Sequence, residues 1–169
     1  MAFFSMGDFA MTGRSLIGTI DLGPRTFGVD DPGLAPACIL AGGGGGFTTV
    51  YSDFVFLPNG SVRFLTYSAG YQQSIPEDAE SARLLRDGRS EQYLELIAEI
   101  EQMDFFSIPT KPITSEMAEY LVVTDETKGI HGVLWARGDT SSLPRSLRAL
   151  VVRLRGILVE RFQKEHRLI

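Results

Sequence analysis

The feature of this sequence that comes closest to a chemical signature is a run of five glycines, Gly42 to Gly46. A phosphate-binding P-loop needs a lysine and a hydroxyl residue directly after its last glycine, because the lysine neutralises phosphate and the hydroxyl binds magnesium. Phe47 and Thr48 follow here instead. A dinucleotide-binding Gly-x-Gly-x-x-Gly pattern fails in each register, because its last position falls on Phe47, Thr48 or Thr49. We therefore predict a hairpin loop or glycine bulge between two strands, and no phosphate site.

Side chains that could bind a metal or act as nucleophiles are few and scattered. The chain has two histidines, His131 and His166, and a single cysteine, Cys38, so an intramolecular disulfide is impossible. Metal sites need clustered ligands, and we expect none. A Cys38–His131 nucleophile pair stays open as an alternative if their strands are adjacent, although no third group that would orient the histidine is evident. Otherwise we expect Cys38 to be a small buried apolar residue and His131 a satisfied core or edge histidine.

Most carboxylates lie on the faces of expected helices, and only Asp53 and Asp125 have other settings. Asp53 lies in an expected strand and Asp125 at the end of another, where each can face solvent or cap a turn. Trp135, the single tryptophan, is expected in the core. These residues do not form a set with complementary catalytic roles. The sequence therefore predicts a protein that is not an enzyme, with no catalytic residues and no cofactor.

Composition and charge favour one ordinary globular domain. The chain has 169 residues, 44% of them hydrophobic and 22% charged, which is enough to bury a core without disulfide or metal support. The formal net charge of −5 does not imply attraction to nucleic acid. No stretch is long and apolar enough for a transmembrane helix, and the first residues do not read as a signal peptide. We expect a cytoplasmic protein.

The pattern of elements predicts an α+β fold in two layers. An about four-stranded antiparallel sheet should carry two amphipathic helices on one face, because tight turns join neighbouring strands. Asn59-Gly60 is the strongest hairpin signal, and Gly129 marks a second turn. Strands are expected near 37–41, 48–57, 62–68, 119–125 and 130–136. Helical patterns begin at Pro76, at Ser90 and near Ser142, which is a candidate N-cap.

The first 36 residues differ from the rest of the chain. We predict an N-terminal arm over 1–36 and a single α+β domain over 37–169. Phe3, Phe4 and Phe9 make the arm too apolar for a free tail, so it should be covered by the protein's own body or by a partner.

Charge is divided between the two helical regions. Residues 77–126 carry 13 acidic and 4 basic residues, a net charge of −9, whereas residues 137–169 carry 8 basic and 3 acidic residues, a net charge of +5. Mutual attraction of neighbouring helices is one explanation. Docking of the basic C-terminal helix on an acidic surface is the other.

Several stretches resemble a known family. These are the glycine–phenylalanine turn and strand at 44–57, "LIAEIEQMDFFSIP" at 96–109, "EYLVVTDETKGIHGVLW" at 119–135 and "LPRSLRALVVRL" at 143–154. Over about 39–162 the chain resembles the emfourin-like domains, small bacterial proteins that include a protein inhibitor of thermolysin-like metallopeptidases. Similar layouts occur in uncharacterised bacterial domains.

The resemblance implies a protein-binding role without catalysis. An inhibitor-like domain would occlude a partner's cleft with a loop, either the glycine loop with Gly45, Gly46 and Phe47, or the loop that contains Arg137 and Asp139. The alternative is an accessory subunit of a larger assembly, docked through the phenylalanines of the N-terminal arm. In both hypotheses the partner is another protein, a peptidase or a host assembly, and not nucleic acid.

Overall fold

The computed structural model describes residues 18–31, 33–45, 50–69, 75–76, 80–85, 90–111, 113 and 117–167. The candidate binding residues Phe3, Phe4, Phe9, Gly46 and Phe47 lie outside these ranges.

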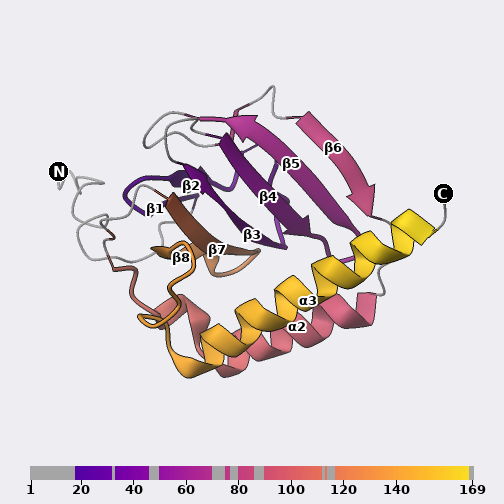
Figure 1. The fold of residues 1–169 in the computed structure, drawn as a ribbon. Coiled ribbons are helices and arrows are strands. Elements are labelled where there is room, and N and C mark those ends of the chain that lie inside the picture. Colours follow the sequence, from indigo (N-terminus) through magenta and orange to yellow (C-terminus); the bar gives the residue numbers. More distant parts are fainter. Residues whose placement is uncertain are drawn as a thin grey trace, which may run out of the picture.

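The architecture is α+β, as predicted, with an antiparallel sheet that is larger than expected (Figure 1). Six strands pair in the order β6-β5-β4-β3-β7-β8, and β1 and β2 form a separate two-stranded sheet. The strands are β1 (Thr19–Asp21), β2 (Thr26–Gly28), β3 (Cys38–Gly45), β4 (Val50–Phe56), β5 (Val62–Ser68), β6 (Glu80–Leu85), β7 (Met117–Asp125) and β8 (Gly129–Ala136). The helices are α2 (Ser90–Gln102), the 3-10 turn η1 (Phe105–Ser107) and α3 (Arg145–Arg167).

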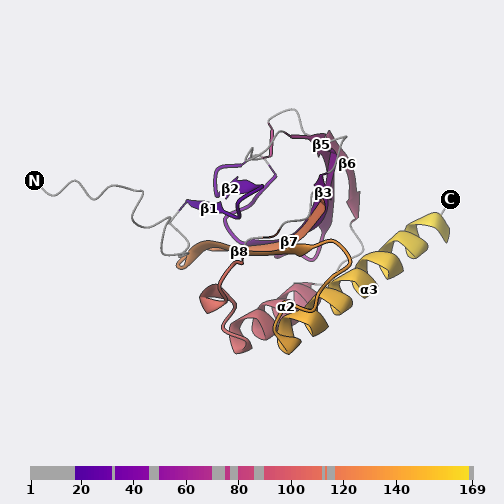
Figure 2. The ribbon, with the colours of Figure 1, turned by 60° about the vertical axis from the view of Figure 1, so that its left-hand side comes forward.

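Both faces of the six-stranded sheet carry a core. Alternate residues of each strand point to opposite faces, so β3 directs Ile39 toward the helices and Leu40 toward the other side. Helices α2 and α3 lie side by side on the first face, which we call the helix face (Figure 1). The β1–β2 hairpin lies on the second, the hairpin face, where the sheet bends around it (Figure 2).

The first part of the helical region was predicted wrongly. The acidic pattern that begins at Pro76 was expected to form a helix, but Glu80–Leu85 is strand β6. Its backbone pairs antiparallel with β5, from Val62 opposite Leu85 to Thr66 opposite Glu80. Pairing with the open edge of β5 supplies backbone hydrogen bonds, and such tertiary context overrides a weak local helix preference.

The glycine run was also predicted wrongly. Gly42 to Gly45 belong to strand β3, where each residue pairs with β4 on one side and with β7 on the other. The expected connection between two strands is therefore an interior strand of the sheet. Glycine lacks the side chain that gives a strand its alternating apolar pattern, so the sequence contains no periodic signal at this point.

The two turn predictions are confirmed. Gly60 has φ of 85° and its N–H donates to the carbonyl of Leu57, which closes the β4–β5 hairpin. Asp125 does cap a turn: its Oδ1 accepts the N–H groups of Thr127 and Lys128, and Gly129 follows with φ of 83°. These turns fix the register of both hairpins.

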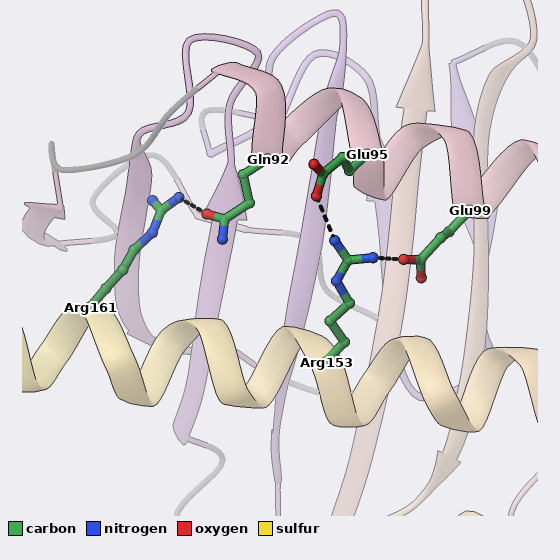
Figure 3. Close-up of polar contacts among 5 residues, drawn as sticks. All are labelled: Gln92, Glu95, Glu99, Arg153 and Arg161. Atoms are coloured by element: carbon green, nitrogen blue, oxygen red, sulfur yellow. Dashed lines mark hydrogen bonds and ion pairs between the residues drawn. The ribbon is translucent and has the colours of Figure 1, made fainter.

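Helices α2 and α3 are joined by polar contacts as well as by the core (Figure 3). Arg153 of α3 pairs with Glu95 and Glu99 of α2, and Arg161 donates to the side chain of Gln92. The attraction between an acidic and a basic helix that the sequence suggested is thus present inside the domain. Helix α3 begins at Arg145, directly after Pro144, which accepts the N–H of Arg148, so Ser142 lies before the cap.

Candidate functional site

A groove of about 360 Å³ opens between the helix face of the sheet and α3. We call it the sheet–helix groove. Its floor is formed by Gly42 to Gly44 with Ala41 and Ser52, and one wall is formed by Val151, Leu154 and Leu158 of α3. Residues from β3, β4, β7, β8 and α3 therefore meet at one place, although they span most of the chain.

The groove exists because the helix face has small residues at this point. Gly43 pairs with Ser52 of β4 and with Glu119 of β7, so these three residues lie in one row across the sheet. The neighbouring row contains Ala41 between Phe54 and Leu121. A glycine, an alanine and a serine cannot fill the space beneath a helix that elsewhere rests on large side chains. The sequence thus leaves a hollow in an otherwise packed layer.

The polar part of the groove is a connected set. Glu119 Oε2 accepts a hydrogen bond of 2.7 Å from Trp135 Nε1 and one of 2.6 Å from Arg155 Nη2. Trp135 is buried, while the side chain of Arg155 is 50% exposed. Arg137, which follows β8, lines the same groove and is exposed. The negative charge of Glu119 is therefore balanced by Arg155, and Arg137 gives the entrance a net positive charge.

Three of the predicted binding residues, Gly45, Arg137 and Asp139, lie in the described ranges, and of these only Arg137 lines the groove. Gly45 ends strand β3, between Val50 and Met117. Asp139 is exposed, and its Oδ1 accepts the N–H and the hydroxyl of Ser141. These two hydrogen bonds, the one from the hydroxyl more than the one from the N–H, lower the pKa of the Asp139 carboxyl. The loop after β8 is thus locally hydrogen-bonded, and Asp139 holds its shape.

The alternative of a Cys38–His131 nucleophile pair is wrong, because the two side chains lie on opposite faces of the sheet. Cys38 belongs to the core on the hairpin face and contacts Thr124, and burial raises the pKa of its thiol. His131 contacts the rings of Phe105 and Phe106 on the other face. Within the described residues, no group of three or more His, Cys, Asp or Glu is placed to hold a metal ion.

Sequence reasoning missed a buried polar cluster on the hairpin face, which consists of Arg25, Asp53, Tyr67 and Tyr120. Asp53 was expected at the surface or at a turn, but it is fully buried and accepts hydrogen bonds from both tyrosine hydroxyls. Arg25, also fully buried, donates to the same hydroxyls. The signal was available: an aspartate in the interior of an apolar strand needs partners, because an unpaired buried charge is costly.

The glycines make room for this cluster. A Cβ atom at Gly42 would lie 1.9 Å from Asp53 Oδ1, and one at Gly44 would lie 2.8 Å from the Cα atom of Tyr51. Gly44 also has φ of 155°, which L side chains rarely adopt. Gly42 and Gly44 are therefore required for packing on the hairpin face, and Gly42 to Gly44 form the floor of the groove on the helix face.

Burial dominates the electrostatics of the cluster. It raises the pKa of Asp53 to about 6, against the opposing effects of Tyr120, Tyr67 and Arg25. Burial and the charge of Asp53 raise the pKa of both tyrosines above their usual range. Burial lowers the pKa of Arg25, but the two tyrosines and Asp53 raise it overall. At neutral pH the cluster therefore contains a cation, a carboxylate and two neutral hydroxyls.

Comparison with known proteins does not assign either site: no family model matches the chain, and no curated protein matches it. The emfourin-like resemblance therefore stays a prediction from the sequence. Among the helices of the described residues, none is long and apolar enough to cross a membrane.

Proposed function

We propose that this chain is a non-catalytic protein-binding domain and that the sheet–helix groove is its binding site. In this proposal the groove takes one apolar side chain of a protein partner. Arg137 and Arg155 at the entrance take acidic residues next to that side chain. The observation that carries the proposal is the hollow left by Ala41, Gly43 and Ser52 beneath α3.

The size and lining of the groove suit an apolar anchor residue. Its volume of about 360 Å³ lies within the range of specific binding pockets. The walls include the aromatic rings of Phe54 and Trp135 as well as aliphatic residues of α3. Binding energy at protein interfaces is concentrated in such pockets, where an aromatic or aliphatic side chain is fully desolvated.

The charge of the entrance favours an acidic partner segment. Arg155 is half exposed while it holds Glu119, and Arg137 forms no ion pair with another described residue. Arg153 differs, because it already forms ion pairs with Glu95 and Glu99 of α2. We therefore expect docking on an acidic surface, the second explanation of the charge asymmetry, to involve the groove side of α3 and not the side that faces α2.

The inhibitor-like role implied by the resemblance would use a different surface from the one first expected. Gly45 lies in a paired strand, so it does not form an occluding loop, whereas Arg137 lies at the groove entrance. A thermolysin-like metallopeptidase is therefore a defined partner to test. The alternative of an accessory subunit rests on Phe3, Phe4 and Phe9, which lie outside the described residues, and no observation favours it.

A fluorescence titration tests the groove directly. Trp135 is the single tryptophan and lines the groove, so its emission reports on occupancy. The probe is a synthetic peptide with one leucine flanked by glutamates. We expect a saturable change in Trp135 emission, which Ser52→Leu abolishes by filling the groove. The matched control, Ser68→Leu, adds the same side chain at an exposed end of β5 and should leave binding intact.

A second experiment varies the charge of the peptide. A peptide with lysines in place of the glutamates should bind at least tenfold more weakly, and Arg137→Glu should weaken the acidic peptide. Arg145→Glu, the same change at an exposed position outside the groove lining, should not. Equal affinity for both peptides, or binding that survives Ser52→Leu, would refute the proposal.

A third experiment uses a purified thermolysin-like metallopeptidase as the binding partner. If the resemblance extends to function, the chain should inhibit the peptidase and co-elute with it in size-exclusion chromatography, and Ser52→Leu should prevent both. Inhibition that is unaffected by Ser52→Leu, or a DNA duplex that competes with the acidic peptide for the groove, would contradict the proposed site.

A further inference from the structure

The buried cluster on the hairpin face has the composition of a cation receptor. The guanidinium carbon of Arg25 lies 3.9 Å from the ring centroid of Tyr51 and 5.1 Å from that of Tyr67. The rings of Phe27 and Tyr120 lie at 5.0 and 5.6 Å. Cations are attracted to aromatic faces within about 6 Å of the ring centroid. Four rings therefore surround one guanidinium group.

Hydrogen bonds add direction to this attraction. Arg25 Nη2 donates to the hydroxyl of Tyr67 at 2.8 Å, and Nη1 lies 3.4 Å from the hydroxyl of Tyr120. Both hydroxyls donate in turn to the two carboxylate oxygens of Asp53. The tyrosines thus connect the cation to its counter-charge. The planar fork of a guanidinium group, unlike an ammonium group, can address two acceptors at once.

The receptor and its ligand come from different parts of the fold. Tyr51 and Asp53 lie on β4, Tyr67 on β5 and Tyr120 on β7, all within the hydrogen-bonded sheet. Arg25 lies in the β1–β2 hairpin, which is outside this sheet. The sheet fixes the receptor side chains through its own ladder, and Gly42 leaves the space that Asp53 occupies.

We propose that the hairpin face of the sheet carries a guanidinium-binding site, formed by Tyr51, Asp53, Tyr67 and Tyr120, and that the chain fills this site with its own Arg25. The ligand class is an arginine side chain or a small alkylguanidinium ion. Without the Arg25 side chain, the site takes such an ion from solution. This inference is independent of the proposed function, because the groove lies toward the opposite face of the sheet.

The test is chemical rescue of Arg25→Ala with ethylguanidinium chloride. Truncation leaves a buried carboxylate without its cation, so the melting temperature should fall strongly. Ethylguanidinium should restore it in a saturable manner, by about 2 to 6 °C at tenfold excess over its dissociation constant. Ethylammonium chloride at the same concentrations, which has the charge but lacks the planar fork, should restore less than a quarter of this shift.

Two controls define the site. The wild-type protein, whose site is filled, should show no saturable stabilisation, and Arg25→Ala/Asp53→Asn should respond to neither ion. Equal rescue by both ions, or rescue of the double variant, would overturn the inference.

A measurement on the wild-type protein covers the case in which Arg25→Ala does not fold. Nuclear magnetic resonance should show Arg25 guanidinium protons that exchange slowly with water and are shifted upfield by the surrounding rings. Guanidinium signals of Arg25 that exchange and average like those of free arginine would also overturn it.

Discussion

Replacing Gly42 by alanine should be one of the most damaging single-methyl additions to this protein. The added Cβ would lie 1.9 Å from Asp53 Oδ1, 2.8 Å from its Cγ and 3.0 Å from the carbonyl of Ser52. Strand β3 cannot move aside, because it is paired along both edges. Asp53 must therefore leave the hydroxyls of Tyr67 and Tyr120, and its charge loses its partners. Breaking a buried charged network in this way costs about 3 to 5 kcal/mol of the free energy of unfolding.

Gly156→Ala is the matched control. Gly156 is exposed on helix α3, and a Cβ atom there would meet nothing within 4 Å. Because glycine is a poor residue in a helix interior, this change should stabilise the protein by about 0.5 to 1 kcal/mol. The same chemical substitution should thus lower the free energy of unfolding at Gly42 and raise it at Gly156.

Urea unfolding measures both changes, with Trp135 fluorescence and far-ultraviolet circular dichroism as independent probes. A double-mutant cycle sharpens the test: in an Asp53→Ala background the carboxylate is absent, so Gly42→Ala should cost at least 1 kcal/mol less than in the wild type. If Gly42→Ala unfolds at the wild-type urea concentration, or costs the same in both backgrounds, the explanation of the glycine run by Asp53 is refuted.

Three further predictions concern charge. Burial raises the pKa of Asp53 from 3.8 to about 6. The contribution of the Asp53 carboxyl to stability is therefore fully present below pH 3.8 and is lost as the pH rises through 6. The pKa shift corresponds to roughly 3 kcal/mol of the free energy of unfolding at most. Urea unfolding at several pH values should therefore show the wild type gaining stability relative to Asp53→Asn as the pH falls from 7 to 5. A difference that does not change with pH would contradict this. Burial lowers the pKa of His131, so its pH dependence has the opposite sign. The contribution of His131 to stability is fully present above pH 6.5 and is lost as the pH falls toward its folded-state pKa. His131→Gln should therefore reduce the loss of the free energy of unfolding between pH 6.5 and lower pH. Arg153→Ala should cost about 0.5 to 1 kcal/mol, because its ion pairs with Glu95 and Glu99 are partly exposed, whereas Arg148→Ala should be nearly neutral; equal effects of the two changes in thermal unfolding would refute the role of the α2–α3 ion pairs.

The sequence contains enough information for the elements that have a strong periodic or turn signal. Helix α3 and the hairpin at Gly60 are placed correctly, because amphipathic spacing and positive-φ turns depend on local residues. Helix α2 is also found, although its apolar residue Leu94 is 62% exposed.

The errors occur where long-range pairing decides the structure. Strand β6 has the local composition of a helix start, and only its pairing with β5 makes it a strand. Gly42 to Gly45 carry no side chains, so their place between β4 and β7 leaves no pattern in the sequence. The candidate site follows the same rule. Arg137 is exposed and lines the groove, but the groove itself depends on the register that aligns Gly43 with Ser52 and Glu119.

The same dependence hides the buried cluster. Arg25 lies in the hairpin and Tyr120 in β7, and 95 positions separate them in the sequence. No local pattern connects two such residues. Asp53 alone indicates such a cluster in the sequence, because a charged residue in the interior of an apolar strand needs polar partners.

The most direct test of the central claim, that the sheet–helix groove binds an acidic and apolar protein segment, is a map of amide chemical shifts during titration with the acidic leucine peptide. We expect the largest changes at Gly42 to Gly44, at Arg137 and along the groove side of α3, and we expect them to vanish in Ser52→Leu. Largest changes on the β1–β2 hairpin, or a pattern that Ser52→Leu leaves unchanged, would contradict it.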